Sequence, residues 1–183
     1  MISQQIDNSR LSTKVDIRRS LAKDGMTVLD CYHGNGVIWS KIAQQVKIRV
    51  IGIEVKKGKG PIAIYGKAEK TIPLLDLSKY DIIDFDSYGS PYEAMKKMFE
   101  NKSLKSGTIC FYTYIQTGYG NVGKKLLSYI GITDNMYKRC PTLYTNKGFE
   151  SFKQFLFANG IKKIYNIYYT DTGSRKNYGY FIV

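Results

Sequence analysis

The sequence predicts an α/β domain with a mainly parallel sheet. Short apolar runs bounded by turn residues alternate along the chain with segments of helical spacing, which is the pattern of strands joined by crossover helices. The chain closes on two apolar, tyrosine-rich runs, residues 163–170 and 178–183, separated by turn-forming residues 171–177, and these predict an antiparallel hairpin. At 183 residues, the chain suffices for one substantial core, so we expect a single domain over residues 1–183.

The expected elements follow in order along the chain. Before the hairpin, the apolar runs predict strands at residues 27–30, 49–54, 62–65, 80–86 and 108–115. Helical spacing predicts helices at residues 15–22, 37–46, 68–77, 122–130 and 149–158, with a further helix after Pro91. In that helix, Tyr92, Met95, Met98 and Phe99 share one face, and proline is tolerated in the first turn. Five strands, crossover helices and a hairpin predict a seven-stranded sheet with helices on both faces.

Composition argues against a membrane protein and against a disulfide-rich secreted protein. The N-terminus, Met1 to Asp7, lacks the basic region and apolar run of a secretion signal, and no stretch resembles a membrane span. The three cysteines, Cys31, Cys110 and Cys140, lie far apart and form no Cys-x-x-Cys pair. We therefore expect a reduced cytoplasmic compartment, no membrane and no metal.

The chain carries a large positive charge. Lys and Arg number 28 against 15 Asp and Glu, for a formal net charge of +13, which would attract a polyanion such as nucleic acid through counterion release. The alternative is that abundant Lys, Ile, Tyr and Asn reflect an A+T-rich coding sequence. The Lys-rich loop after Glu54, residues 56–60, is likewise either a phosphate contact or a solvated loop.

A glycine loop and an acid predict a nucleotide-like ligand. Asp30 ends an expected strand, and Gly34 and Gly36 then turn the chain into a helix at Val37. Glycines let the backbone approach a ligand, and the helix N-terminus faces it. Glu54 ends the next strand 20 residues after Gly34, the offset of a ribose-binding acid. Without the glycine loop before it, Glu54 would be interpreted as a solvent-exposed carboxylate that caps a strand.

The details of this loop resemble those of methyltransferases. The third glycine of a dinucleotide fingerprint would fall at Trp39 and is absent. Residues 30–36, Asp-Cys-Tyr-His-Gly-Asn-Gly, instead resemble the Asp-x-Phe-x-Gly-x-Gly loop of amino-group methyltransferases, which use S-adenosylmethionine. The resemblance implies that Asp30 approaches the methionine amino group. The cofactor-loop residues that it implies are Asp30, Tyr32, His33, Gly34 and Gly36. His33 is the only histidine, and its place in this loop favours a loop side chain over a general base.

A second motif follows the strand at 80–86. Residues 86–91, Asp-Ser-Tyr-Gly-Ser-Pro, resemble the Asp-Pro-Phe/Tyr-Gly-Ser-Pro motif of the tRNA N2-guanine dimethyltransferase family. The resemblance implies a Rossmann-like class I methyltransferase fold, S-adenosylmethionine as cofactor, and an exocyclic amino group of a nucleic-acid base as substrate. The simpler reading, a strand-to-helix turn with Asp86 as helix cap, is compatible with it.

The chemistry explains why such a motif is needed. An exocyclic amine is a poor nucleophile because its lone pair is delocalised into the ring. Asp86 and the main-chain carbonyl of Ser87 would accept its two N–H bonds and stabilise the developing positive charge. Tyr88 would stack on a base brought out of its helix. Asp84 falls on the same strand face as Asp86, but we expect it to be structural.

The resemblance has limits that leave alternatives open. It covers Val28 to Pro91, Ser87 replaces a proline, and the family's members are larger. Lys67 stands where an Asp usually contacts the adenine amino group, so we expect main chain near Ala68 to make that contact. The expected function is methyl transfer to an exocyclic amine, with guanine N2 in tRNA or another structured RNA first. The alternatives are a DNA amino-methyltransferase (adenine N6 or cytosine N4) and an inactive cofactor-binding module that holds nucleic acid.

Several aromatic and basic residues outside these motifs allow two readings. Tyr112, Tyr114 and Tyr119 surround the end of the fifth strand, where they form either part of a base pocket or ordinary packing. Arg175, Lys176 and Tyr178 near the hairpin turn would add a basic and aromatic contact.

Overall fold

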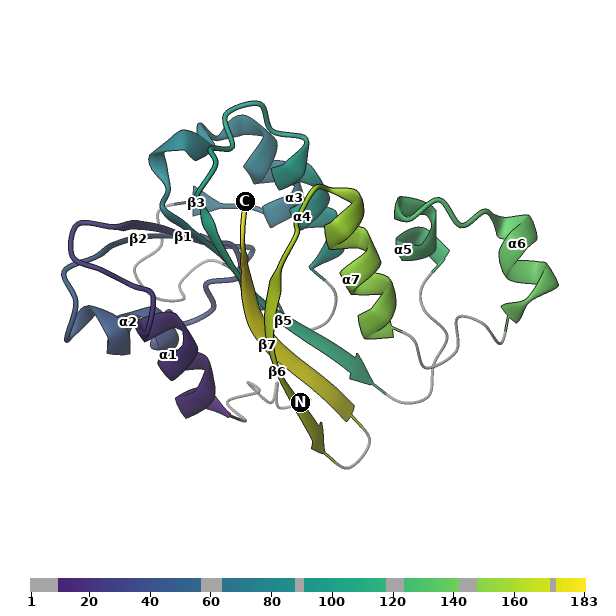
Figure 1. Ribbon diagram of the computed structural model, residues 1–183. Coiled ribbons are helices and arrows are strands. Elements are labelled where there is room, and N and C mark those ends of the chain that lie inside the picture. Colours follow the sequence, from purple (N-terminus) through teal and green to yellow (C-terminus); the bar gives the residue numbers. More distant parts are fainter. Residues whose placement is uncertain (1–9, 57–63, 88–90, 118–123, 142–147, 172–173) are drawn as a thin grey trace.

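The strands form one sheet that matches the expected class. The computed structural model describes residues 10–56, 64–87, 91–117, 124–141, 148–171 and 174–183, and the strands of these residues build a seven-stranded sheet in the order β3-β2-β1-β4-β5-β7-β6 (Figure 1). Strands β1 to β5 pair in parallel, and β7 lies antiparallel between β5 and β6. The strands are β1 Thr27–Asp30, β2 Arg49–Glu54, β3 Ile64–Tyr65, β4 Ile82–Phe85, β5 Ile109–Thr117, β6 Ile164–Asp171 and β7 Ser174–Ile182. The expected mainly parallel sheet with a closing hairpin is confirmed.

Helices cover both faces of the sheet (Figure 1). Residues of α1 and α2 pack against one face around Trp39 and Phe111, whose rings meet edge-on at 6.2 Å. Residues of α4 and α7 belong to the core on the other face, where the Phe152 ring stacks on Tyr114 at 5.4 Å. The described helices are α1 Leu11–Arg19, α2 Val37–Ala43, α3 Ala68–Thr71, α4 Tyr92–Phe99, α5 Lys124–Tyr129, α6 Asp134–Arg139 and α7 Gly148–Ala158.

The tyrosines of β5 belong to the core. Tyr112 is fully buried and Tyr114 nearly so, and both rings contact Phe152 of α7. Of their two readings, the structure supports packing for Tyr112 and Tyr114. Tyr119 lies outside the described residues.

Several elements differ from the expected ones. The first helix, expected at residues 15–22, begins and ends earlier, at Leu11–Arg19. The helix expected at 68–77 ends as an α-helix at Thr71 and continues as 3-10 turns, Ile72–Leu74 and Leu77–Lys79, because Pro73 offers no N–H and its ring clashes with a preceding carbonyl. The hairpin turn expected at 171–177 is shorter, since Ser174 to Asn177 pair as part of β7. Helix α6 was not expected; Thr133 caps it by accepting a bond from the Met136 N–H.

The three cysteines are free thiols. Cys31 and Cys110 are buried thiols and Cys140 is an exposed one, and burial raises the pKa of the Cys31 and Cys110 thiols. Within the described ranges, every helix is too short or too polar to cross a bilayer. Those same residues contain no group of three or more His, Cys, Asp or Glu side chains arranged to hold a metal ion.

Candidate active site

Three acids lie at one edge of the sheet. Asp30 ends β1, Glu54 ends β2, and Asp86 follows β4 directly. Strand β1 pairs with β2 on one side and β4 on the other, with Asp30 opposite Gly52 and Asp84. Because these strands are parallel, their carboxyl ends share an edge, and the strand order reverses beside β1. This is the place where open α/β sheets bind ligands.

The glycine loop is tied to Glu54. Gly34 and Gly36 have φ angles of 54° and 66°, in the left-handed region that glycine tolerates. The Gly34 N–H donates to Glu54 Oε2 at 2.9 Å. The N–H groups of Val55 and Lys56 donate to Glu54 Oε1 at 2.9 and 3.0 Å. Glu54 is half-buried and joins the ends of β1 and β2, so it is not simply an exposed acid.

The His33 side chain is buried in this loop, against Gly36 and Gly52. A Cβ atom on Gly36 would lie 2.7 Å from His33 Cε1 and Nε2, and a Cβ on Gly52 would clash with His33 Cγ. The His33 side chain is 3% exposed, and its Nδ1 lies 3.0 Å from Asp30 Oδ2. His33 is therefore a loop side chain, and a buried one. The imidazole fills the space that the two glycines leave, and it orients the Asp30 carboxylate.

Asp30 is a carboxylate with few neutralising partners. It is 5% exposed and accepts the Tyr32 N–H at 3.4 Å. Burial raises the pKa of Asp30 to about 6; the bond from His33 opposes this shift and the nearby Asp84 adds to it. A cation placed beside Asp30 would favour its ionised form.

Tyr32 and Ala68 belong to the same hydrophobic core. Tyr32 is half-buried and packs against the core, where burial raises the pKa of its hydroxyl. Ala68 is buried at the start of α3, and the Gly66 N–H donates to the Glu54 carbonyl at 3.0 Å. The turn before α3 therefore lies beside Glu54. Lys67 is exposed at the N-cap of α3, without a side-chain cap bond.

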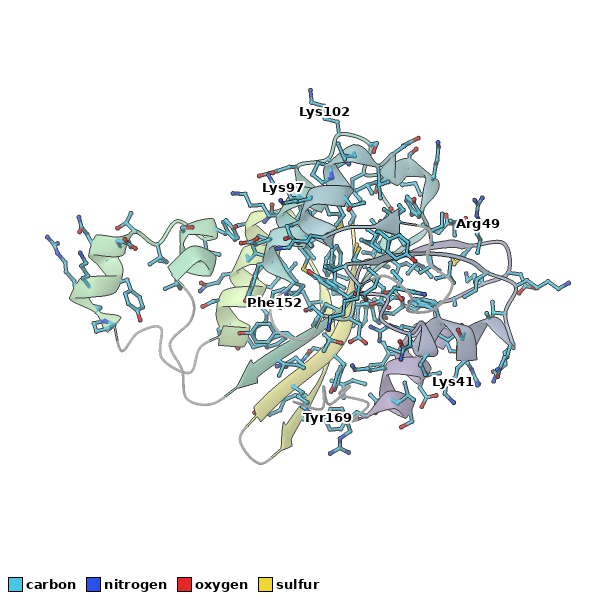
Figure 2. All side chains as sticks on the ribbon, turned by 180° about the vertical axis from the view of Figure 1, so that it is seen from behind. Lys41, Arg49, Lys97, Lys102, Phe152 and Tyr169 are labelled. Atoms are coloured by element: carbon cyan, nitrogen blue, oxygen red, sulfur yellow. The ribbon has the colours of Figure 1, made fainter. Side chains whose placement is uncertain are left out.

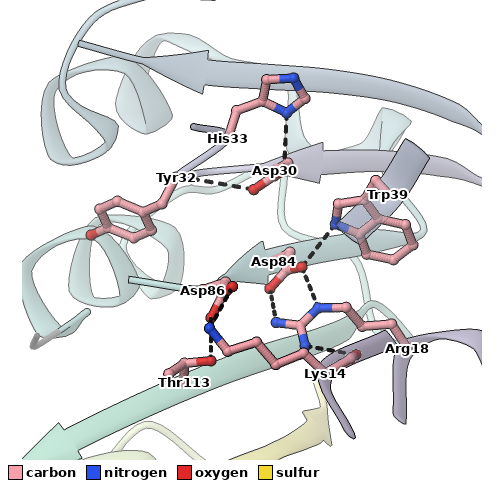
Figure 3. Close-up of polar contacts among 9 residues, drawn as sticks. All are labelled: Lys14, Arg18, Asp30, Tyr32, His33, Trp39, Asp84, Asp86 and Thr113. Carbon is pink, nitrogen blue, oxygen red and sulfur yellow. Dashed lines mark hydrogen bonds and ion pairs between the residues drawn. The ribbon is translucent and has the colours of Figure 1, made fainter. Parts of the chain in front are cut away.

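A second group of acids lies under α1 (Figure 3). Arg18 Nε and Nη2 donate to the two oxygens of Asp84 at 2.6 and 2.7 Å, and Trp39 Nε1 donates to Asp84 Oδ2 at 2.8 Å. All three side chains are buried. Burial opposes the charge on Arg18, but Asp84, Asp86 and Asp30 together outweigh it and raise the pKa of the guanidinium. Asp84 is structural, as expected from the sequence, because it anchors α1 and α2 to the sheet.

Asp86 is held by the same helix. Lys14 Nζ lies 3.0 Å from Asp86 Oδ1 and 3.1 Å from Oδ2, and the Thr113 hydroxyl donates to Oδ1 (Figure 3). The Lys14 and Asp86 side chains are 8% and 13% exposed. A carboxylate has about four lone-pair positions, so bonds from the described residues leave one acceptor position on Oδ2. Of the next two motif residues, Ser87 and Tyr88, only Ser87 is described. Ser87 is buried after a tight turn, its N–H donating to the Phe85 carbonyl at 2.8 Å, whereas Tyr88 lies outside the described residues.

Sequence reasoning missed Lys14, Arg18 and Thr113. One signal was available for the first two, since Lys14 and Arg18 are four residues apart and share a face of α1. Asp84 and Asp86, two apart, share a face of the strand end. Two cations at helical spacing thus match two acids at strand spacing. Neither pattern by itself indicates which acid meets which cation.

Comparisons with known proteins agree on the fold. No protein-family model and no curated protein matches the sequence. A protein from Clostridium thermocellum assigned to the rRNA methylases aligns over 94% of this chain and 96% of its own, with a TM-score of 0.56 at 16% identity. TYW2 of P. horikoshii, in complex with MeSAdo, aligns over 100% of this chain and 66% of its own, with a TM-score of 0.61 at 18% identity.

A third structure comes from an enzyme with a different substrate. Phosphoethanolamine N-methyltransferase 2 of Haemonchus contortus, in complex with S-adenosyl-L-methionine, aligns over 93% of this chain and 52% of its own, with a TM-score of 0.61 at 12% identity. Identities this low establish architecture rather than substrate. Strand order, the antiparallel β7 and these alignments together show that the chain has the fold of the class I S-adenosylmethionine-dependent methyltransferases.

Proposed function

We propose that this protein is an S-adenosylmethionine-dependent methyltransferase that acts on an exocyclic amino group of a nucleic-acid base, with guanine N2 in a structured RNA as the first candidate. One observation carries the proposal. Glu54, Asp30 and Asp86 follow one another at the ends of β2, β1 and β4, along one edge of a class I methyltransferase fold. That order puts the cofactor acids beside the candidate catalytic acid.

The residues at this edge suit the cofactor. Among the described residues, Asp30 and Glu54 are held by backbone N–H groups and by His33 rather than by Lys or Arg. Glu54 would accept the ribose hydroxyls, and Asp30 would face the methionine ammonium. S-adenosylmethionine carries two positive charges and would supply the methyl group. Loop residues Tyr32, His33, Gly34 and Gly36 would shape its site, with main chain near Ala68 at the adenine.

The catalytic role falls to the end of β4. Asp86 and the Ser87 carbonyl would accept the two N–H bonds of the amine, which turns its lone pair toward the methyl group. The new N–C bond would form as the S–C bond of S-adenosylmethionine breaks. The bonding pair would stay on sulfur to give S-adenosylhomocysteine, and the extra amine proton would pass to the Asp86 carboxylate and from there to water. Lys14 and Thr113 hold the Asp86 carboxylate in one orientation while Oδ2 retains an acceptor position. Tyr88 would stack on the target base.

Two features support nucleic acid as the substrate. The net charge of +13 favours a polyanion, whereas a small metabolite would not require it. The Clostridium thermocellum protein, whose length this chain nearly matches, is assigned to the rRNA methylases. RNA is therefore placed before DNA.

The test combines a binding measurement with an activity assay. Calorimetry with S-adenosylmethionine should show binding that Glu54→Ala weakens at least about tenfold, or about 1.4 kcal/mol, because ribose hydrogen bonds are lost. Glu100→Ala is the matched control, since Glu100 is an exposed acid at the C-terminal cap of α4 and pairs with Lys97. Unchanged affinity in Glu54→Ala would remove the ribose assignment.

The activity assay follows transfer of a tritiated methyl group to bulk tRNA, rRNA and DNA. Label on guanine N2 of RNA is the expected result. Label on DNA alone would assign the protein to the DNA amino-methyltransferases. Cofactor binding without label on any of the three would indicate an inactive module, and methylation of a ring carbon would exclude the amine mechanism.

A further inference from the structure

The β6–β7 hairpin presents an aromatic face beside α1. Alternate residues of β6 oppose alternate residues of β7, with Tyr165 opposite Tyr180 and Ile167 opposite Tyr178. Tyr180 contacts Phe111, so this face is the one that α1 and α2 cover nearer the middle of the sheet. We call it the hairpin face; its residues are Lys163, Tyr165, Ile167, Tyr169, Lys176, Tyr178 and Tyr180.

Helix α1 covers only one end of the hairpin face. Thr13 Oγ1 lies 3.2 Å from the Tyr169 hydroxyl, and Lys14 Nζ lies 5.6 Å from the centre of the Tyr178 ring. Farther along β6, Tyr165 and Ile167 are 39% and 44% exposed. Strand β6 is also the edge of the sheet. A large apolar ring and a branched aliphatic side chain thus remain accessible to a partner.

The accessible aromatic residues are accompanied by cations. Lys163 Nζ lies 4.7 Å from the centre of the Tyr165 ring, which stacks on Tyr180 at 4.4 Å and 11°. Arg10 lies 4.6 Å from the centre of the Tyr169 ring. The sequence contains no Asp or Glu from residue 151 to 170 or from residue 172 to 183. Aromatic rings interleaved with cations, with few acids nearby, are typical of surfaces that bind single-stranded nucleic acid.

One end of the hairpin face lies near the candidate catalytic acid, Asp86. Tyr178 lies opposite Thr113 on β5, and Thr113 donates to Asp86. The segment from Tyr169 to Tyr165 spans about 13 Å of extended strand. The face therefore runs from Tyr178, near Asp86 and beside α1, to the accessible Tyr165 and Lys163 at the start of β6, away from the hairpin turn.

We propose that the hairpin face binds a single-stranded segment of the RNA substrate that flanks the target nucleotide. Tyr165 and Ile167 contact bases, while Lys163 and Arg10 contact phosphates. Charge complementarity selects this partner over a second copy of the chain, because two copies would bring the same cations together. The inference rests on the proposed function for RNA as substrate, but binding is measured separately from methyl transfer.

The experiment measures anisotropy of a labelled oligouridylate of roughly 12 nucleotides, within the site sizes of such platforms. Tyr165→Ala and Lys163→Glu should each weaken binding about fivefold or more, because a stacking surface or a phosphate contact is lost. Lys102→Glu is the matched control, with the same charge change at an exposed position; Figure 2 shows Lys102 and Tyr169 at opposite ends of the molecule. The control should change affinity less than about twofold. Calorimetry should show unchanged S-adenosylmethionine affinity in all three variants.

Several results would overturn the inference. Equal weakening by Lys163→Glu and Lys102→Glu would mean that net charge alone binds RNA, and equal affinity for oligothymidylate would remove the assignment to RNA. Light scattering that shows a parental dimer and a monomeric Tyr165→Ala variant would assign the face to a second copy. Since Lys163 is exposed, its variant tests the face even if Tyr165→Ala fails to fold. If the variants weaken RNA binding but the parental protein transfers no methyl group, this inference stands and the proposed function is contradicted. If all variants methylate RNA and bind it with unchanged affinity, the proposed function stands and this inference is contradicted.

Discussion

The acids under α1 and the acids at the glycine loop lie at neighbouring strand ends, yet different partners neutralise them. Asp84 and Asp86 pair with Arg18 and Lys14. In the loop, Glu54 is held by backbone N–H groups, and Asp30 by one N–H and His33. A buried acid that already faces a cation has no need of a charged ligand. An acid held by neutral donors keeps its charge available for one.

Depth along the strand separates the two acids under α1. Asp84 is fully buried, and a guanidinium and an indole N–H hold it on both oxygens. Asp86, two residues later, reaches the sheet edge with a lysine, a hydroxyl and a remaining acceptor position. The inner acid is therefore suited to anchoring α1, and the outer acid to contacting a substrate.

The most severe change should be Asp84→Asn. It leaves the buried Arg18 guanidinium without a countercharge, so the free energy of unfolding should fall by about 3–5 kcal/mol. Urea unfolding followed by circular dichroism measures it. The double variant Arg18→Leu/Asp84→Leu should recover part of the loss because both charges are removed. A loss of unfolding free energy below about 0.5 kcal/mol for Asp84→Asn would show that the Arg18–Asp84 ion pair does not anchor α1 to the sheet.

Asp86→Asn should leave the fold intact and impair the reaction. The amide keeps the shape but weakens the acceptor and removes the negative charge, so turnover should fall roughly a hundredfold or more while S-adenosylmethionine affinity holds. The methyl-transfer assay and calorimetry measure the two quantities. Methylation of RNA at the parental rate would remove Asp86 from the mechanism and make both acids under α1 structural.

Lys14→Met tests Asp86 separately from Asp84, because it removes only the cation that pairs with Asp86. Asp86 would lose its fixed orientation, so kcat should fall about tenfold with little change in KM. Lys14→Arg should restore part of the rate because it returns a cation to Asp86. An increase in kcat for Lys14→Met would contradict the positioning role, since it would mean that Lys14 competes with the substrate for Asp86.

The smallest expected effect is the pH dependence of cofactor binding at the loop acids. The pKa of Asp30 is raised to about 6, so the carboxyl becomes protonated as the pH falls through that value. The ionised form is the one that would bind the methionine ammonium, and affinity should therefore fall about fourfold between pH 7 and pH 5.5. Calorimetry at several pH values measures it. Asp30→Asn should bind weakly and without this dependence, whereas Glu54→Ala should retain it; a pH-independent parental affinity would contradict the assignment.

Local sequence patterns determined most of the sheet and the glycine loop. Strands β1 and β2 have the bounds expected from their apolar runs, because turn residues and side-chain alternation act over a few residues. The offset from Gly34 to Glu54 predicted that both belong to one ligand site, since consecutive parallel strands bring their carboxyl ends together; the hydrogen bond between them was not expected. The broken helix after Thr71 was also locally encoded, in Pro73, but the expected helix ran through it.

Only the tertiary structure decided the partners of the buried groups. Lys14 meets Asp86 across 72 positions of sequence, and Arg18 meets Asp84 across 66. The His33 ring occupies space left by Gly52 on the neighbouring strand, and the hairpin face forms where β6 and β7 bring tyrosines together. Sequence alone establishes that cations, acids and aromatic residues are present. The packing of strands and helices decides which of these side chains are buried together. It therefore decides which pairs contribute to stability and to the reaction.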